Sequence, residues 1–459
     1  MTPSLLAQLV SATLGGQLIP FGLDGKIITS LAMEYPEGNI PYSRYFPLAA
    51  GTGGEGVFEI IPFDSAPQWQ SIGLAGKSIS ALTIQHWGRG PADGQRALAA
   101  VHPNSGQVDT VLIYEKDVFF QLDTIWMPSD SGLDRTSITR VRAFSSYYYT
   151  GHTAPQPIIL GGDTGLYYGR DVWSRATYDG PVRVNSIDVA LHWFGELAWA
   201  AGQQGLSAVA LRSTDQGRNW TTFFLPLLIE GEAFSVAINP AYPDTVYVGG
   251  YGVLWMTTDG GSSWLPSSLQ PPSVTITTLG VDPVWSQVVY AGGIRQDSSF
   301  AFYYSKDAGS SWTEVSPPDT QRVAGVSSLA IAHLSDIGDF EAAYAFIGTL
   351  GTGVWQFLIS GVTGVEEPSN VPDRFHLYQN YPNPFNPVTQ IRFEVGGLRF
   401  VSLRVYDVLG REVATLVNEV KEPGVYSVAW DARELSSGVY FYRLTAGRFV
   451  ETKKLLLAE

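Results

Sequence analysis

Apolar, small and polar residues follow one another in a repeating pattern along the first 360 residues. Each copy has a strand-like stretch ending in small residues and glycine, a second strand-like stretch, and a polar turn with an aspartate and a tryptophan. The clearest copies end at Trp173, Trp220, Trp264 and Trp312. Seven copies of roughly 48 residues each fit between about residues 26 and 360. A period of about 40–50 residues with four short strands per copy is typical of a β-propeller.

The last copy ends one strand after its glycine turn, near Leu358, so its sheet lacks an outer strand. The stretch from Leu5 to Phe21 is left without a place in the repeat. We therefore expect residues 1–21 to supply the missing strand and close the ring, because closure removes the open edges of a sheet.

The composition changes after residue 360. Residues 361–372 are rich in Gly, Pro and acidic side chains, which is typical of a linker. Beyond them apolar residues alternate with polar ones, as at Ile391, Phe393 and Val395, which predicts a small β-sandwich. The fold prediction is therefore all-β, with a seven-bladed β-propeller over 1–360, a linker over 361–372 and a sandwich over 373–459.

Composition and charge exclude several kinds of function. The 459 residues contain no cysteine, so disulfides, thiolate metal sites and a cysteine nucleophile are excluded. The net charge of −15 lies entirely in the first 372 residues, which argues against nucleic acid or an anionic membrane as a partner. No apolar run approaches the roughly 18–20 residues of a membrane span, and we expect no membrane insertion. The N-terminal stretch has no Lys or Arg and is a poor secretory signal.

Three turns share one spacing of short polar residues, glycine and tryptophan. Their residues are Ser213, Asp215, Gly217, Asn219 and Trp220; Thr257, Asp259, Gly261, Ser263 and Trp264; and Ser305, Asp307, Gly309, Ser311 and Trp312. They resemble the Asp-box (BNR) repeats of sialidase-like, sortilin-like and photosystem-assembly-factor-like propellers, with Asn219 in place of the usual Ser or Thr. The resemblance implies a structural turn, in which short side chains bond turn amides and tryptophan fills the space between sheets.

Candidate site residues lie in the loops after the glycine-rich second strands, on the face opposite these turns. They are Glu55, His102, Asp163, Gln203, Tyr251, Arg295 and Asp297. A glycoside hydrolase needs two carboxylates roughly 5–10 Å apart. Glu55, Asp163 and Asp297 are the catalytic candidates, joined by Glu230 or Glu232 from a loop between units; His102, Gln203, Tyr251 and Arg295 are binding candidates. The alternative is that all of these are ordinary polar loop residues.

Other chemistries find little support in the sequence. A sialidase-like site would present three arginines to a carboxylate, and only Arg295 fits that role. The six histidines are scattered without the spacing of metal ligands, so we expect neither a metal nor a cofactor.

The C-terminal region resembles the type A sorting domain of the type IX secretion system. The residues that carry the resemblance are Tyr381, Pro382, Asn383, Pro384, Phe385, Asn386, Pro387, Tyr406, Asp407, Leu409, Gly410, Arg411, Glu412, Gly424, Tyr426, Trp430, Asp431, Ser437, Gly438, Val439, Tyr440, Phe441, Tyr442, Arg443, Lys453 and Lys454. The resemblance implies an immunoglobulin-like domain read by the secretion machinery and removed by a sortase-like peptidase.

Together these observations predict a cargo protein that is exported through the periplasm to the outside or the cell surface. The interpretation we favour is that the propeller binds a protein or glycan partner. The alternative is a propeller glycoside hydrolase acting on extracellular polysaccharide. An assembly factor like the photosynthetic Asp-box propellers would fit the blades but not the sorting domain.

Overall fold

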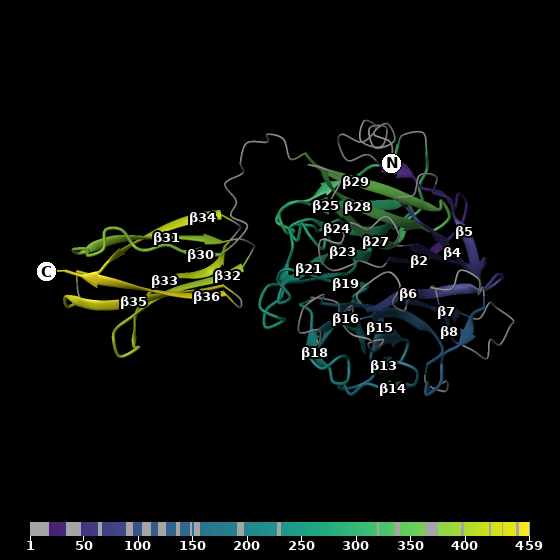
Figure 1. The fold of residues 1–459 in the computed structure, drawn as a ribbon, viewed down its shortest axis with the longest axis horizontal. Coiled ribbons are helices and arrows are strands. Elements are labelled where there is room, and N and C mark those ends of the chain that lie inside the picture. The colour runs from purple at the N-terminus through teal and green to yellow at the C-terminus, as the bar shows by residue number, and fades with distance from the viewer. Residues whose placement is uncertain are drawn as a thin grey trace. The chain divides into compact units, whose positions relative to one another are not determined.

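The structure is a computed structural model. It describes residues 18–33, 47–62, 67–88, 95–102, 112–117, 125–134, 138–146, 149–150, 157–190, 197–226, 231–318, 321–335, 340–362, 375–395, 399–421, 424–433, 435–446 and 449–458. Every regular element in these residues is a strand, so the described chain is all-β (Figure 1). Over the same ranges, no helix has the length and apolar character needed to cross a membrane.

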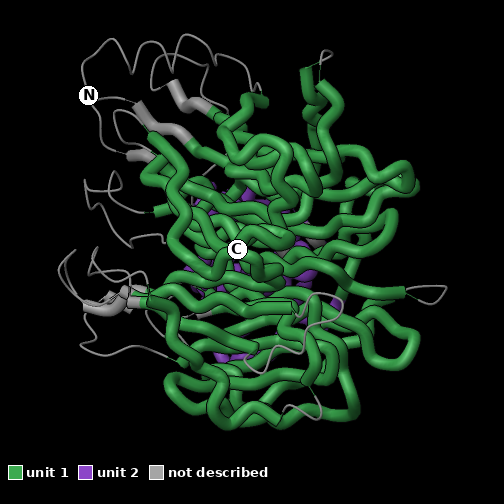
Figure 2. Tube along the Cα trace, turned by 90° about the vertical axis from the view of Figure 1, so that its right-hand side faces the viewer, with its two compact units in different colours: residues 1–256, 264–363 green, residues 257–263, 364–459 purple. Residues whose placement is uncertain are grey.

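The chain divides into two compact units, coloured separately in Figure 2. Unit 1 comprises residues 1–256 and 264–363, and unit 2 comprises residues 257–263 and 364–459. The last strand of unit 1 extends to Val362, so it continues into the segment 361–372 that the sequence predicts as a linker.

The described strands of unit 1 form seven sheets, each built mainly from consecutive strands. In chain order of their first strands, the first three sheets are β2 (Ile28–Met33), β3 (Leu48–Thr52), β4 (Val57–Ile60) and β5 (Gln70–Gly73); β6 (Ser78–Gly88), β7 (Gln95–His102), β8 (Ile113–Asp117), β9 (Met127–Pro128) and the parallel β11 (Tyr149–Thr150); and β10 (Val141–Ser146), β12 (Ile158–Gly162), β13 (Gly165–Gly169) and β14 (Trp173–Arg175). The next two are β15 (Arg183–Val189), β16 (Ala198–Gln204), β17 (Ser207–Ser213) and β18 (Thr221–Phe224); and β19 (Ser235–Ile238), β20 (Val246–Gly249), β21 (Leu254–Thr257) and β22 (Leu265–Pro266). The last two are β23 (Val274–Val281), β24 (Val289–Arg295), β25 (Phe300–Ser305) and β26 (Thr313–Glu314); and β27 (Val326–Ser335), β28 (Phe340–Thr349), β29 (Val354–Val362) and β1 (Leu18–Pro20).

The antiparallel order gives unit 1 two distinct faces. In each sheet the first strand begins beside the end of the second strand. Ser78 at the start of β6 lies opposite His102 at the end of β7, and Val274 at the start of β23 lies opposite Arg295 at the end of β24. We call this face the upper rim. The turns that join third to fourth strands, including the three Ser/Thr-x-Asp turns, fall on the opposite face.

Neighbouring sheets approach one another closely through glycines of the second strands. In five of the seven sheets such a glycine faces a β-branched side chain at the start of the next first strand. An added Cβ would lie 2.4–2.7 Å from that side chain: Gly51 with Ile79, Gly161 with Val184, Gly249 with Ile276, Gly292 with Val326 and Gly348 with Ile28. Since carbon atoms do not pack so closely, only glycine fits these positions.

A hydrogen bond from side chain to backbone reinforces five of the junctions between described sheets. The donors and the accepting carbonyls are Ser80 to Val141 (2.7 Å), Asn185 to Ala233 (2.9 Å), Ser235 to Ile276 (3.0 Å), Thr277 to Val326 (2.6 Å) and Ser327 to Ile28 (2.5 Å). Four of these donors sit at a register shift of their own strand. A bulge re-aims a side chain, and here it turns the donor towards the next sheet.

Unit 2 contains two antiparallel sheets around one apolar core. The three-stranded sheet is formed by β30 (His376–Leu377), β31 (Val388–Val395) and β34 (Gly424–Asp431), and the four-stranded sheet by β33 (Glu412–Lys421), β32 (Arg399–Tyr406), β35 (Gly438–Ala446) and β36 (Phe449–Leu457). Phe393 from one sheet and Leu403 and Leu444 from the other are buried in this core. Each strand therefore alternates core and solvent positions.

Strand β1 joins the N-terminal part of the described chain to the last sheet of unit 1. It pairs antiparallel with β29, with Leu18 opposite Phe357, and Leu18 is only 5% exposed. Phe21 donates its N–H to the Val354 carbonyl (2.7 Å), and its own carbonyl accepts from Trp69 Nε1 of the adjacent sheet (2.8 Å). Residues 1–17 of the predicted closing segment lie outside the described residues.

Deletion of residues 1–21 should lower the melting temperature strongly. The deletion removes the β1–β29 hydrogen bonds and the buried Leu18 side chain, whose burial alone contributes about 2–3 kcal/mol. Differential scanning calorimetry measures the effect. Deletion of residues 1–17 is the matched control because it leaves β1 in place, and equal melting curves for the two deletions would contradict the prediction.

Candidate functional site

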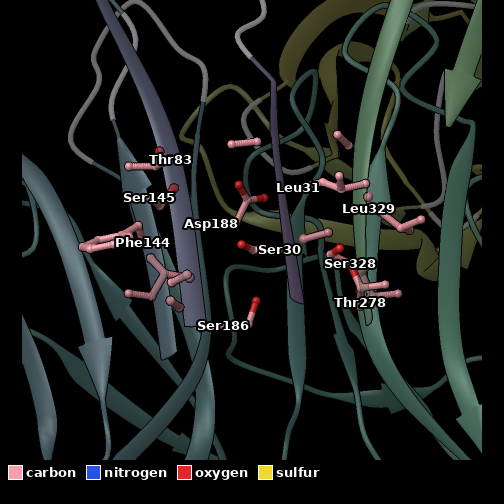
Figure 3. Close-up of a pocket in the computed structure, with 18 of the residues that line it drawn as sticks. Ser30, Leu31, Thr83, Phe144, Ser145, Ser186, Asp188, Thr278, Ser328 and Leu329 are labelled. Atoms are coloured by element: carbon pink, nitrogen blue, oxygen red, sulfur yellow. The ribbon is translucent and has the colours of Figure 1, made fainter. Parts of the chain in front are cut away.

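The first strands of the seven sheets surround a common channel of about 450 Å³. Each of β2, β6, β10, β15, β19, β23 and β27 contributes residues to its lining. Figure 3 shows labelled lining side chains from six of these strands, with Asp188 among them. The channel is therefore the place where all seven sheets can present groups to one ligand.

The lining is formed mostly by aliphatic and hydroxyl side chains. Ser30, Thr83, Ser145 and Ser186 are examples of the hydroxyl groups (Figure 3). Among the described lining residues, Asp188 is the one carboxylate. Glycoside hydrolysis uses two carboxylates, and the described lining supplies one.

Asp188 is held by backbone amides from two sheets. Its Oδ1 accepts from the Val189 N–H (2.9 Å), and its Oδ2 accepts from the Ile238 N–H in the next sheet (2.7 Å). Burial raises the pKa of Asp188 from 3.8 to about 6, although these two hydrogen bonds oppose the shift. The carboxyl therefore ties β15 to β19, and its burial favours the protonated form.

The three predicted catalytic carboxylates are each engaged locally and lie outside the channel lining. Glu55 forms an ion pair with Lys26. Asp163 accepts from Arg142 Nε (2.6 Å) and from the Thr139 hydroxyl (2.9 Å).

Asp297 completes a turn of its own, where it accepts from the Ser299 N–H (3.0 Å) and hydroxyl (2.5 Å). Hydrogen bonds from Ser299 lower the pKa of Asp297. The three carboxylates belong to three different sheets, and the lining of the channel does not bring them together.

The predicted binding residues lie at the upper rim in separate contacts. Gln203 accepts from Arg183 (2.5 Å), and Arg183 also pairs with Glu232 (2.8 Å). Arg295 pairs with Glu314. Tyr251 is 58% exposed.

His102 lies at the end of β7, where burial and the nearby Arg140 lower its pKa. Its Nδ1 is shielded from solvent. Glu230, the remaining acidic candidate, lies outside the described residues.

The three Ser/Thr-x-Asp turns repeat one hydrogen-bond network. In the first, Asp215 Oδ1 accepts from the Ser213 hydroxyl (2.9 Å) and the Asn219 N–H (2.9 Å), and the Gly217 N–H donates to Ser213 (3.0 Å). Thr257, Asp259, Gly261 and Ser263, and Ser305, Asp307, Gly309 and Ser311, make the same contacts. The aspartates are therefore occupied by their own turns.

Burial alone would raise the pKa of Asp215 and Asp259, but the hydrogen bonds of the turns lower both. These carboxylates are consequently charged acceptors at neutral pH and are unsuited to proton transfer. Each of the three turns is thus a closed local network of hydrogen bonds.

The periodic tryptophans fill the spaces between the sheets of unit 1. Trp126 donates to the Ile72 carbonyl (2.8 Å) and Trp173 to the Ser129 carbonyl (2.8 Å), in both cases in the preceding sheet. Trp220 instead donates to Gly217 of its own turn (2.8 Å). Among the tryptophans whose burial the structure describes, none belongs to the large exposed apolar side chains.

Sequence reasoning missed Asp188 and the residues of the first strands. Their signal is a β-branched residue followed by a hydrogen-bonding residue and a small one, as in Ile79-Ser80-Ala81, Val184-Asn185-Ser186 and Ile276-Thr277-Thr278. Aligning this triplet would have located the channel strands and, three residues after Asn185, Asp188.

In unit 2, the segment 381–387 runs along the end of β36. Asn383 Oδ1 accepts from the Leu456 N–H (2.8 Å), and the Phe385 N–H donates to the Leu456 carbonyl (3.0 Å). Phe385 is buried against Trp430, whereas Tyr381 is 81% exposed. The peptide bonds before Pro382 and Pro384 are cis.

The other predicted signal residues lie in turns and on β35 and β36. Asp407 accepts from the Arg411 N–H (2.9 Å) across a turn in which Gly410 has a positive φ of 77°. Gly438 starts β35, and Tyr440 on that strand donates to the Ser436 carbonyl (2.8 Å).

Lys453 pairs with Glu451 (3.0 Å), and the Lys454 carbonyl accepts from the side-chain amide of Gln379 (2.7 Å). Residues 379–458 match the family described as secretion system C-terminal sorting domain. Unit 2 contains a secretion sorting domain. The prediction of a sorting domain is thus confirmed, and it marks the chain as cargo for export to the outside or the cell surface.

Other similarities cover either a short segment or most of the chain. A 93-residue segment is 32% identical to the photosystem II assembly lipoprotein Ycf48 of Synechococcus, covering 20% of this chain and 26% of that protein. Ycf48 from Cyanidioschyzon merolae has a TM-score of 0.48 at 12% identity, with 74% of this chain and 98% of that one covered. A GH74 enzyme from Niastella koreensis has a TM-score of 0.41 at 10% identity, with 92% and 84% covered. At these TM-scores neither likeness bears on the function of this chain.

The Asp188→Asn variant should lose a pH dependence of stability. Because the folded pKa is raised, the protonated carboxyl stabilises the fold below about pH 4, and this contribution is lost as pH rises through 6. For the native chain we expect this group to lower the free energy of unfolding by about 2–3 kcal/mol between pH 4 and 7. Urea unfolding at several pH values measures the difference from Asp188→Asn. Asp179→Asn, at an exposed position, is the control, and parallel pH curves for native protein and Asp188→Asn would rule the prediction out.

Proposed function

We propose that the protein is a secreted or cell-surface binding protein exported by a type IX secretion system. In this proposal residues 1–360 are a seven-bladed Asp-box propeller that presents its upper rim to a protein or glycan partner. Residues 373–459 are an immunoglobulin-like sorting domain, removed after export by a sortase-like peptidase. The sorting-domain match at 379–458 supports the export half of the proposal.

One observation carries the binding half: the described lining of the central channel holds a single carboxylate, Asp188. Hydrolysis of a glycosidic bond uses an acid and a second carboxylate as base or nucleophile. Glu55 and Asp163, which sequence reasoning put forward, are instead neutralised by Lys26 and Arg142. Binding without cleavage therefore has more support than the glycoside hydrolase alternative.

Fusion of residues 361–459 to a periplasmic reporter should send the reporter outside a host that has type IX secretion. The matched control is a fusion of residues 361–378, which lacks the matched segment and should leave the reporter in the periplasm. Fractionation with a reporter assay measures both. Retention of the longer fusion in the periplasm would refute the export assignment.

A panel of extracellular polysaccharides should be retained by the protein without being cleaved. Affinity electrophoresis measures retention, and a reducing-end assay measures cleavage on the same samples. Heat-denatured protein is the control for non-specific retention. Release of reducing ends by the native protein but not by an Asp188→Asn variant would favour the hydrolase alternative. If no polysaccharide is retained, a protein partner is the remaining candidate.

A further inference from the structure

The tyrosine at the start of the segment 381–387 stands out on the surface of unit 2. Tyr381 is 81% exposed, which is the largest exposed fraction among the large apolar side chains of the described chain. Pro382 and Pro384, which follow it, are exposed as well. Transfer of apolar surface from water to a partner is favourable, so a ring in this position is suited to binding.

The backbone that carries this exposed ring is tightly held. Tyr381 and Gln390 exchange both of their backbone hydrogen bonds (3.0 Å each). The buried side-chain amide of Asn380 donates to the Pro382 carbonyl (3.0 Å) and to the Thr389 hydroxyl (3.0 Å). The Thr389 hydroxyl in turn donates to the same Pro382 carbonyl (2.9 Å). The ring therefore extends from a fixed backbone, and a partner need not order this segment when it binds.

Tyr381 lies on the outer face of the three-stranded sheet of unit 2. Gln390 points outward, because both of its neighbours on β31 are buried. Residues directly opposite each other in an antiparallel pair project from the same side, so Tyr381 shares this face with Gln390 and with Val388. Ala429 of β34 lies opposite Gln390 and is exposed there too. We call Tyr381, Val388, Gln390 and Ala429 the tyrosine face.

The composition of the tyrosine face is that of a contact surface for a protein. Its four residues carry no charge, and the neighbouring Asp431, opposite Val388, forms an ion pair with Arg433. The centres of protein interfaces are depleted of charged residues and enriched in tyrosine. A tyrosine also supplies a large contact area at a low cost in conformational entropy, because it has only two rotatable side-chain bonds.

The family of unit 2 indicates which protein meets this face. All four residues of the tyrosine face lie within the segment 379–458 that matches the secretion sorting domain. In the proposed function this domain is removed after export, so a surface on it cannot serve the released protein. The partner that meets the domain before its removal is the export machinery.

We propose that the tyrosine face is the surface through which a protein component of the export machinery recognises the folded sorting domain. The Tyr381 ring enters an apolar pocket of that component, where its hydroxyl meets a hydrogen-bonding group. Other residues of the sorting motifs, such as Phe385 and Trp430, are buried in the core and maintain the fold instead. This inference rests on the proposed export function and specifies the surface that the machinery reads.

Export of the full chain, directed into the periplasm of a host that has type IX secretion, tests the tyrosine face. Cell fractionation and immunoblotting measure the share that leaves the periplasm. Tyr381→Ser should reduce this share about tenfold, because one central tyrosine often carries much of the binding energy of an interface. Val388→Lys, which places a charge on the same face, should also reduce it about tenfold. Tyr381→Phe keeps the ring and should be exported nearly as well as the native chain. Val450→Ser is the matched control, because it removes a 56% exposed apolar side chain from β36 in the other sheet.

Circular dichroism melting of each purified variant establishes that it is folded, and Val388→Lys decides the test if Tyr381→Ser is not. Export of a folded face variant at the native level would overturn the inference, and so would an equal defect in Val450→Ser. Analytical ultracentrifugation detects the other possible occupant: a native dimer that Tyr381→Ser dissociates would assign the face to a second copy of the chain and overturn the inference as well. Retention of the native chain itself in the periplasm would instead refute the export function on which the inference rests.

Discussion

The contact between one sheet and the next is the constraint on which unit 1 depends. At five of the seven junctions between described sheets a β-branched side chain from a first strand presses against a glycine of the preceding sheet, and at three of these a hydroxyl also donates to the backbone across the same junction. The first contact sets the distance between sheets and the second sets their register. Because each side chain spans two sheets, no sheet can shift without disturbing its neighbours.

This close packing also decides what the centre of the unit can do. The first strands reach the channel with short hydroxyl and aliphatic side chains, and the bulge residues that could carry chemistry are turned sideways to bond the next sheet. Asp188 follows the same rule, since its carboxylate bridges two strands. The side chains that are free to contact a ligand therefore lie at the upper rim.

The sequence was informative where a residue type has a single structural use. The spaced glycines, aspartates and tryptophans of unit 1 and the ordered motifs of the sorting domain are of this kind. It was uninformative where the partner is remote: nothing near Asp163 in the chain indicates that Arg142 neutralises it, or that Lys26 neutralises Glu55. Asp188 was overlooked because a polar residue in an alternating strand is normally solvent-facing, and only the ring turns that position inward.

The pairing of β1 with β29 has a consequence for the order of events in the cell. These strands are separated by more than 330 residues, so their sheet is among the last contacts that a growing chain can make. The residues that match the sorting domain begin at 379, a short stretch of chain after β29 ends at Val362. Synthesis of the export signal and completion of the last sheet therefore fall close together in time, and a chain interrupted before this point has neither.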